Sequence, residues 1–183
     1  MRRCRTCKQY AIANELPKSV WWCSPACKVY RNGVRVANVK AKPKKKKLKS
    51  IARVVDDCAV LLQRLVRLKA ADSNGYAKCV TCGKVEKWQD LEGGHFIQRN
   101  RTSVKIEEEN LAPQCHYCNH RAMKTTLGVL AYREYMVGMY GQEFVDELIA
   151  RSKQSRKYYR ADLELIRADF VTRIKEQESR LGI

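Results

Sequence analysis

The chain has 183 residues, 45% of them hydrophobic, with 37 Lys and Arg residues against 19 Asp and Glu residues. This length accommodates one ordinary domain or two small ones, and the apolar content excludes a wholly disordered chain. The formal net charge of +18 makes nucleic acid the expected partner. We expect a cytoplasmic protein without a membrane partner, because no signal peptide or membrane-spanning run is present.

Positive charge is concentrated towards the N-terminus. Residues 1–49 contain fifteen Lys and Arg residues and one acid, Glu15, and so carry +14 of the total. Within them, residues 40–49 predict a linker or arm, since self-repulsion and Pro43 disfavour a packed element. This stretch is either a solvated hinge or, as we favour, a phosphate-binding arm. Its consecutive lysines are Lys44, Lys45, Lys46 and Lys47.

The nine cysteines indicate metal binding rather than disulfides, because a reducing cytosol keeps thiols free. Residues 1–39 contain two close cysteine pairs with the ligand spacing of a zinc knuckle. These cysteines are Cys4, Cys7, Cys23 and Cys27. So short a segment buries too little apolar surface to fold alone, and zinc would supply the missing stability. Trp21 and Trp22 either cover this zinc site, the simpler interpretation, or stack on nucleic-acid bases.

A second set of cysteines has the same arrangement. Cys79 and Cys82 form one pair and Cys115 and Cys118 another, with two residues inside each pair. This spacing lets a tight turn point both thiolates at one tetrahedral zinc ion. The thirty-two residues between the pairs are enough for two strands and a loop. Zinc held by four thiolates has no open position, so we expect both zinc ions to be structural.

Residues suited to phosphodiester hydrolysis lie in and beside this zinc-bound loop. His95 follows two glycines, Asn110 lies further along, and Asn119 directly follows the last cysteine. A histidine can take the proton of an attacking water, and a divalent ion can stabilise charge at the phosphate. An ion such as Mg²⁺ prefers carboxylate and amide oxygens, so Asn119, Glu92 and Asp90 are its candidate ligands.

The remaining sequence predicts helices. Apolar residues recur at helical spacing over residues 50–72, and Cys58 on this stripe is interpreted as a core residue. Three helical segments follow the cysteine cluster, the first broken near Gly138 and Gly141. Their apolar stripes are Leu127, Leu130, Tyr135 and Met139; Phe144, Leu148 and Ile149; and Tyr159, Leu163, Ile166, Phe170 and Ile174.

The predicted fold class is therefore α+β. We expect residues 1–39 to form a zinc knuckle and residues 40–49 a basic linker. Residues 50–183 would then hold a helix, a small zinc-bound core at about residues 76–126, and C-terminal helices.

The cysteine cluster and its loop resemble the HNH, or ββα-metal, nuclease motif. The resemblance is carried by Cys79-Val80-Thr81-Cys82-Gly83, Gly94-His95-Phe96, Asn110-Leu111 and Cys115-His116-Tyr117-Cys118-Asn119. It is closest to the variant with an asparagine after the last cysteine pair, as in the phage Holliday-junction endonuclease VII. With the Trp-Trp-Cys-Ser-Pro knuckle and the basic linker, most of residues 1–150 resembles the lambdoid phage NinG (Rap) recombination nucleases.

The resemblance implies a role for each matched residue. His95 would be the general base, Asn110 would orient its imidazole, and Asn119 would bind the catalytic metal. The second cysteine cluster would hold structural zinc. The motif usually has an aspartate directly before the histidine, whereas this chain has Gly94. Glu92, or less favourably Asp90, would then supply the missing carboxylate.

Other polar residues near the motif are weighed separately. His116, between two zinc-binding cysteines, and His120 are each expected to be surface or phosphate-contacting residues. His120 directly follows Asn119, and one step along a helix turns a side chain by about 100°. His120 would therefore point away from a metal bound by Asn119. Candidate phosphate-binding residues around the cleft are Arg99, Arg101, Arg121 and Lys124.

We predict a metal-dependent endonuclease acting on branched DNA such as Holliday junctions or D-loops, with branch specificity implied by the resemblance alone. Its cofactors would be two structural zinc ions and a catalytic Mg²⁺ or Mn²⁺. Two symmetric cuts favour a homodimer, and phage or host recombination proteins are further expected partners. By resemblance, a phage or prophage would encode the protein and it would act in the bacterial cytoplasm. The alternative is a non-catalytic, zinc-dependent nucleic-acid-binding protein, while a thiol-disulfide oxidoreductase is disfavoured.

Overall fold

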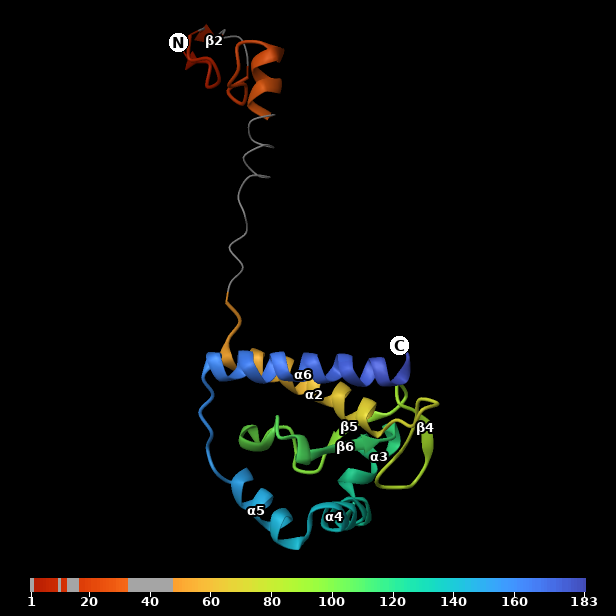
Figure 1. Ribbon diagram of the computed structural model, residues 1–183. Helices are drawn as coiled ribbons and strands as arrows, with labels where there is room; N and C mark the ends of the chain where they lie inside the picture. The colour runs from red at the N-terminus through yellow and green to blue at the C-terminus, as the bar shows by residue number, and fades with distance from the viewer. Residues whose placement is uncertain (1, 10, 13–16, 33–47) are drawn as a thin grey trace. The chain divides into compact units, whose positions relative to one another are not determined.

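The computed structural model describes residues 2–9, 11–12, 17–32 and 48–183. The chain divides into two units, Met1–Leu48 and Lys49–Ile183 (Figure 1). The predicted phosphate-binding lysines, Lys44 to Lys47, lie outside the described residues. No helix among the described residues has the length and apolar character needed to cross a membrane.

The first unit contains little regular structure. Strands β1 (Arg2–Arg3) and β2 (Ala11–Ile12) pair antiparallel, and residues 25–32 are helical. Cys4 and Ile12 are its fully buried apolar residues among those described, at 1% and 2% exposure. So small a core agrees with the expectation that a metal ion supplies much of the stability.

The second unit is organised around α2 (Ile51–Ala70), which matches the helix predicted at residues 50–72. The helix begins at Ser50, whose side chain accepts a hydrogen bond from Arg53 N, as an N-cap residue should. Cys58 is fully buried, which confirms its interpretation as a core residue. The buried side chains of α2 are Val54, Val55, Cys58, Ala59, Leu62, Leu65, Val66 and Leu68.

Two β-hairpins follow α2. In the first, β3 (Tyr76–Lys78) pairs with β4 (Val85–Lys87). In the second, β5 (Glu92–His95) pairs antiparallel with β6 (Leu111–Gln114), placing Glu92 opposite Gln114 and His95 opposite Leu111. The short helix α3 (His116–His120) follows β6 directly.

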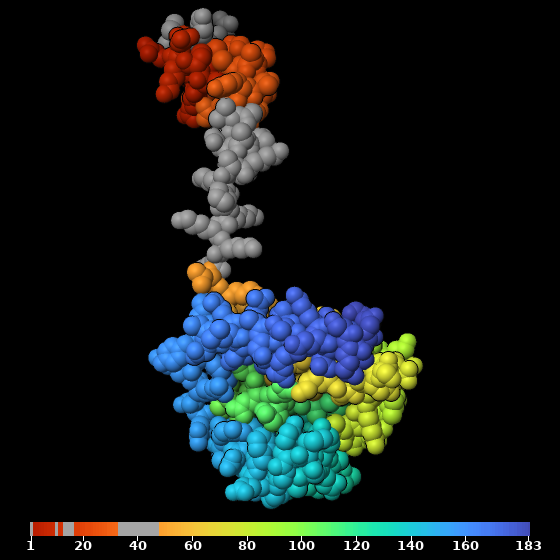
Figure 2. Space-filling model, in the orientation of Figure 1, coloured from red at the N-terminus to blue at the C-terminus, as the bar shows by residue number. Residues whose placement is uncertain are grey.

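The β5–β6 hairpin lies between two layers of helices. On one face, α2 packs against the long α6 (Arg160–Leu181), and their shared apolar cluster includes Leu111 of β6. On the other face, α4 (Thr126–Tyr140) and α5 (Gln142–Ser152) contribute to a cluster that includes Ala112. Figure 1 shows this order of layers, and Figure 2 shows α6 covering much of α2. Helices with small sheets confirm the α+β class at this level.

The structure corrects the predicted face of α4. The stripe expected to be buried is largely exposed, with Leu127 at 80%, Leu130 at 48% and Met139 at 57%. The buried large side chains are Tyr132 and Met136. The helix also continues through Gly138 and breaks at Gly141 alone, where φ is +88°. The helix is apolar almost all round, so periodicity did not identify its buried side.

Gly93 is required by close packing, because a Cβ there would lie 2.7 Å from the Cα of Gln63 in α2. We therefore expect Gly93→Ala to lower the free energy of unfolding by about 1–3 kcal/mol. Gly138→Ala is the matched control, since nothing lies within 4 Å of its added Cβ. It should stabilise α4 by about 0.5–1 kcal/mol. Chemical denaturation of the zinc-loaded protein measures both, and equal effects would contradict the packing argument.

Candidate functional site

The four central cysteines are arranged as a metal centre. The Sγ atoms of Cys79, Cys82, Cys115 and Cys118 all lie within 4.8 Å of one another, and Cys82 Sγ is 3.8 Å from Cys115 Sγ. Thiolates bound to one tetrahedral zinc at 2.3 Å are about 3.8 Å apart, whereas disulfide sulfurs are about 2.05 Å apart. The spacing therefore fits a zinc ion and excludes a disulfide.

The ionisation of these thiols fits the same interpretation. Burial raises the pKa of Cys79, but hydrogen bonds from the backbone of Cys115, Cys82 and Thr81 outweigh it and the net pKa is lowered. Burial raises the pKa of Cys115 and Cys118. A cation is therefore needed for all four sulfurs to be thiolates together.

The first unit contains an equivalent group. Cys4, Cys7, Cys23 and Cys27 also place their sulfurs within 4.8 Å of one another. Cys23 Sγ lies 3.6 Å from both Cys7 Sγ and Cys27 Sγ. The two cysteine groups could therefore each hold a zinc ion, as the spacing predicts.

The two tryptophans of the first unit are half-buried and lie beside basic side chains. The guanidinium of Arg5 lies 3.8 Å from the centroid of Trp21, and Lys28 Nζ lies 4.9 Å from that of Trp22. The Arg2 guanidinium also lies 5.9 Å from the Trp21 centroid. Both rings thus make cation–π contacts, and base stacking by the tryptophans stays a prediction.

The central cysteines connect α3 to the first hairpin. The turn after Cys79 closes through Gly83, whose N donates to Cys79 O at 2.9 Å and whose φ of +77° suits glycine. Cys115 is the N-cap of α3, and Cys118 lies within this helix. A five-residue helix is unstable alone, so a metal on these sulfurs would hold the α3 side chains in place.

Glu92 is the meeting point of the α3 polar side chains. Its Oε1 lies 2.8 Å from His116 Nδ1, and its Oε2 lies 2.9 Å from His120 Nε2 and 2.5 Å from Asn119 Nδ2. Hydrogen bonds from Asn119 and His116 outweigh burial of the carboxyl group and lower the pKa of Glu92. Glu92 is therefore a carboxylate at neutral pH, with three side chains of one helix around it.

The contacts of Glu92 bear on two sequence predictions. His120 was expected to point away from a metal bound by Asn119, yet both side chains contact the same carboxylate group. Residues three and four apart share a helix face, so His116, Asn119 and His120 converge despite the 100° step between neighbours. Asp90 is exposed and lies outside this group, so of the two candidate carboxylates Glu92 is the one near Asn119.

His95 is buried at 7% exposure and lines a cavity of about 830 Å³ together with Glu92 and Asn119. Its Nε2 lies 3.0 Å from the carbonyl oxygen of Lys105, which can only accept, so Nε2 carries the hydrogen. Burial, with smaller contributions from the positive charges of Arg99 and Lys105, lowers the pKa of His95 to about 4, although the hydrogen bond to the Lys105 carbonyl raises it. The ring is therefore neutral at pH 7, with Nδ1 as a proton acceptor.

Asn110 holds the loop that carries the Lys105 carbonyl group. Its fully buried amide accepts from Ile97 N at 2.8 Å and donates to Ile97 O at 3.1 Å and Val104 O at 3.0 Å. Asn110 was expected to orient the imidazole of His95. Its side chain instead bonds to the backbone of Ile97 and of Val104, the residue directly before Lys105. Its influence on the ring is therefore indirect.

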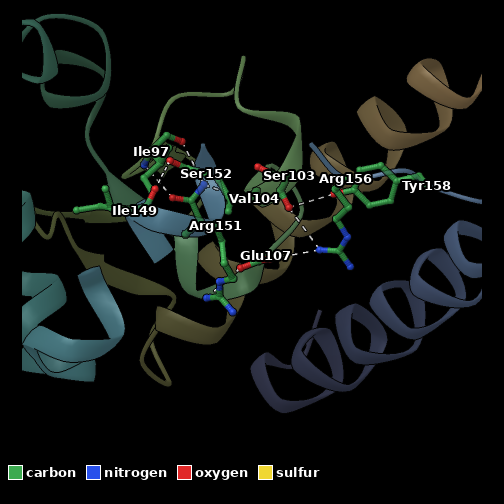
Figure 3. A network of polar contacts seen from close by, with 10 residues as sticks. Ile97, Ser103, Val104, Glu107, Ile149, Arg151, Ser152, Arg156 and Tyr158 are labelled. Atoms are coloured by element: carbon green, nitrogen blue, oxygen red, sulfur yellow. Dashed lines mark hydrogen bonds and ion pairs between the residues drawn. The ribbon is translucent and has the colours of Figure 1, made fainter. Parts of the chain in front are cut away.

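The same loop is fixed from outside by the C-terminal segments (Figure 3). Glu107 pairs with Arg151 and Arg156, each at 3.3 Å, and Tyr158 OH donates to Thr102 O at 2.9 Å. Exposed ion pairs of this kind contribute little individually. Together with the Asn110 bonds they hold both sides of the residue 97–107 loop.

The structure gives a physical reason for glycine at position 94. A Cβ there would lie 1.9 Å from Oε1 of Gln114, a fully buried residue whose Nε2 donates to Thr81 Oγ1 at 2.6 Å. The Gln114 amide therefore occupies the space of a side chain at position 94. Glu92 lies two residues earlier on the same face of β5 and is the carboxylate nearest to this position on the strand.

The cavity is strongly basic. Of the predicted phosphate-binding residues, Arg99, Arg101 and Lys124 line it, while the exposed Arg121 does not. Sequence reasoning missed Arg67 of α2, which also lines it. The Arg67 guanidinium donates to Leu91 O at 2.9 Å and to Gln89 O at 3.3 Å, so it is held in place at the cavity wall. In the sequence, helix periodicity indicates only that Arg67 lies beside the apolar stripe of α2.

The neutral state of His95 can be measured directly. The folded-state pKa of about 4 lies below the ordinary value of 6.5, so stability from this group is present above pH 6.5 and lost as the pH falls towards 4. In NMR titrations between pH 5 and 8, the His95 ring should keep neutral chemical shifts down to pH 5.5. His95→Gln identifies its signal among the three histidines. A midpoint near 6.5 would show that the ring is solvated.

Asn110→Ala should destabilise the protein by about 3 kcal/mol, because three hydrogen bonds in a buried site lose their partner. Asn100→Ala is the matched control, since Asn100 is exposed in the same loop. It should change stability by less than about 0.5 kcal/mol. Urea denaturation of the zinc-loaded proteins tests this, and a loss below 1 kcal/mol at Asn110 would mean that the loop does not depend on it.

A comparison with family models identifies a relationship over nearly the whole chain. The model described as Bacteriophage Lambda NinG protein matches residues 1–180. Comparisons with curated proteins and with solved structures give no match. The matched range includes both cysteine groups, His95 and the Glu92 cluster, and it confirms the NinG resemblance drawn from the sequence. The chain therefore belongs to the bacteriophage lambda NinG protein family.

Proposed function

We propose that this protein is a metal-dependent DNA endonuclease of the HNH type that cuts branched recombination intermediates. The observation that carries the proposal is the buried, neutral His95 in the wall of a basic cavity that Glu92 and Asn119 also line. A proton acceptor, an oxygen-ligand pair and phosphate-binding cations in one cavity are the groups that phosphodiester hydrolysis requires.

His95 is the proposed general base. Its Nε2–H is engaged by the Lys105 carbonyl, so Nδ1 is the nitrogen that accepts the proton of the attacking water. The Asn110-held loop positions this carbonyl and therefore fixes both the tautomer and the orientation of the ring. His95 needs no deprotonation before reaction, because its pKa of about 4 keeps it neutral.

Glu92 and Asn119 are the proposed ligands of the catalytic ion. The carboxylate and amide fit the oxygen preference of Mg²⁺ or Mn²⁺, and they lie 2.5 Å apart at their closest atoms. When bound, the ion would stabilise negative charge at the phosphate and on the departing oxygen. The two tetrathiolate groups would hold structural zinc and have no part in the chemistry.

The basic residues of the cavity are proposed to hold the DNA backbone. Arg67, Arg99, Arg101 and Lys124 outnumber the single acid, Glu92, in its lining. Such contacts bind phosphates without reading sequence and weaken with salt. The family relationship supports a role in phage recombination, and specificity for Holliday junctions or D-loops is proposed from the sequence resemblance. Paired cuts across a four-way junction would need two copies of the chain.

A non-catalytic, zinc-dependent nucleic-acid-binding protein is the second candidate. Gly94 in place of an aspartate and the concentration of charge in residues 1–49, which precede the motif residues in the sequence, favour it. Both functions require salt-sensitive DNA binding, so binding alone does not separate them.

Cleavage by a His95 variant separates the two functions. Purified protein is incubated with labelled linear and four-way DNA, with and without Mg²⁺ or Mn²⁺. His95→Ala should reduce cleavage at least about 100-fold, because the general base is lost. DNA binding should stay nearly unchanged, since the cationic side chains remain.

Elemental analysis provides the folding control, with two zinc ions per chain expected in both proteins. Unaltered cutting by His95→Ala would remove His95 from the mechanism. DNA binding without metal-dependent cleavage by the wild type would favour the non-catalytic function.

A further inference from the structure

Two histidines that the proposed mechanism does not use lie against its metal-binding carboxylate. His116 Nδ1 is 2.8 Å from Glu92 Oε1, and His120 Nε2 is 2.9 Å from Glu92 Oε2. One nitrogen from each ring and one carboxylate oxygen lie within 4.8 Å of one another. Two ligand atoms at right angles around an ion, each about 2.1 Å from it, are about 3 Å apart. The two imidazole–carboxylate contacts, made to different oxygens of Glu92, have the length of hydrogen bonds and are also short enough for ligands of one ion.

The arrangement of the rings suits a shared ion. His116 and His120 are four residues apart on α3, and their ring centroids lie 4.4 Å apart with planes inclined by 34°. Both rings thus project from the same face of a helix that the tetrathiolate group holds at Cys115 and Cys118. Helix α3 therefore places the two imidazole rings next to each other through its backbone geometry.

The surroundings leave room for further ligands. The His116 and His120 side chains are 76% and 55% exposed, so an ion can enter from solvent. Asn119 contacts the same Glu92 oxygen as His120. The oxygen and nitrogen of an amide are assigned from such contacts, so Asn119 could turn its oxygen towards an ion. Glu92 and Asn119 line the His95 cavity, which places the site at the cavity edge.

We infer that Glu92, His116 and His120 form a binding site for a late first-row divalent ion such as Co²⁺, Ni²⁺ or Zn²⁺. Two imidazoles and one carboxylate favour such ions, whereas Mg²⁺ prefers an all-oxygen environment. The site is a third metal position, separate in ligand type from both tetrathiolate groups. Glu92 is also a ligand of the proposed catalytic ion, so on the proposed function, on which this clause rests, the two ions would compete for one carboxylate.

Calorimetric titration of the zinc-loaded full chain with Ni²⁺ tests the site. Wild type loaded with only two equivalents of Zn²⁺, which the two cysteine groups take in preference, should bind one Ni²⁺ per chain and retain both zinc ions. His116→Ala and His120→Ala should each weaken Ni²⁺ binding more than tenfold, since even loss of an outer-shell partner costs about 10–100-fold. Mg²⁺ affinity should change much less, because the oxygen ligands remain.

Tyr117→Ala is the matched control, since Tyr117 is on the same helix and 68% exposed. It should bind Ni²⁺ like the wild type, and zinc content reports whether each variant is folded. Ni²⁺ affinity that is unchanged in folded His116→Ala and His120→Ala would overturn the site.

Cleavage assays separate this inference from the proposed function. Histidine-dependent Ni²⁺ binding by a protein that cuts no DNA would retain the metal site and refute the endonuclease. Metal-dependent cleavage, together with a Ni²⁺ affinity that neither His116→Ala nor His120→Ala changes, would retain the endonuclease and refute the site.

Discussion

The side chains of the candidate site depend on the attachment of one short helix. Helix α3 has five residues, too few to be stable alone, yet it carries His116, Asn119 and His120 to a single carboxylate. Two of the four sulfurs in the central group belong to this helix or its N-cap, and the other two belong to the turn after β3. A metal on these sulfurs would therefore set the position of α3 against β5. The four central cysteines, which have no direct part in the proposed chemistry, would thus determine how the α3 side chains meet Glu92.

The β5–β6 hairpin is the other half of this arrangement, and packing limits where its polar residues can be. Gly93 lies under Gln63 of α2, and Gly94 faces the buried amide of Gln114, so neither position has room for a side chain. Of the four residues of β5, Glu92 and His95 are left to carry functional groups. Glu92, two residues before Gly94, lies on the same face of the strand because of the two-residue period of a strand. Close packing therefore gives a physical reason for glycine at position 94.

Local patterns predicted much of this molecule. The cysteine spacing predicted both tetrathiolate groups, and helical periodicity predicted α2 and most of the buried face of α6. Contacts between distant segments were not predictable in this way. Arg67 lines the cavity because α2 crosses β5, and Leu127 is exposed because α4 packs through Tyr132 and Met136. The convergence of the α3 side chains could have been predicted from the sequence, because His116 lies three residues before Asn119 and four before His120. The prediction considered only the 100° step between neighbouring residues.

The electrostatics of the cavity would connect the proposed DNA binding to the basicity of His95. Burial is the main cause of its lowered pKa, and the positive charges of Arg99 and Lys105 lower that pKa further. Arg99 lines the cavity, whereas Lys105 is already paired with Asp56 at 2.5 Å. A phosphate bound by Arg99 would offset part of the unfavourable charge, because opposite charges near an imidazole stabilise its protonated form. The ring would then be a stronger base with DNA bound than in the free protein. Since burial remains, the rise would be partial, and the ring would still be unprotonated at neutral pH before the reaction begins.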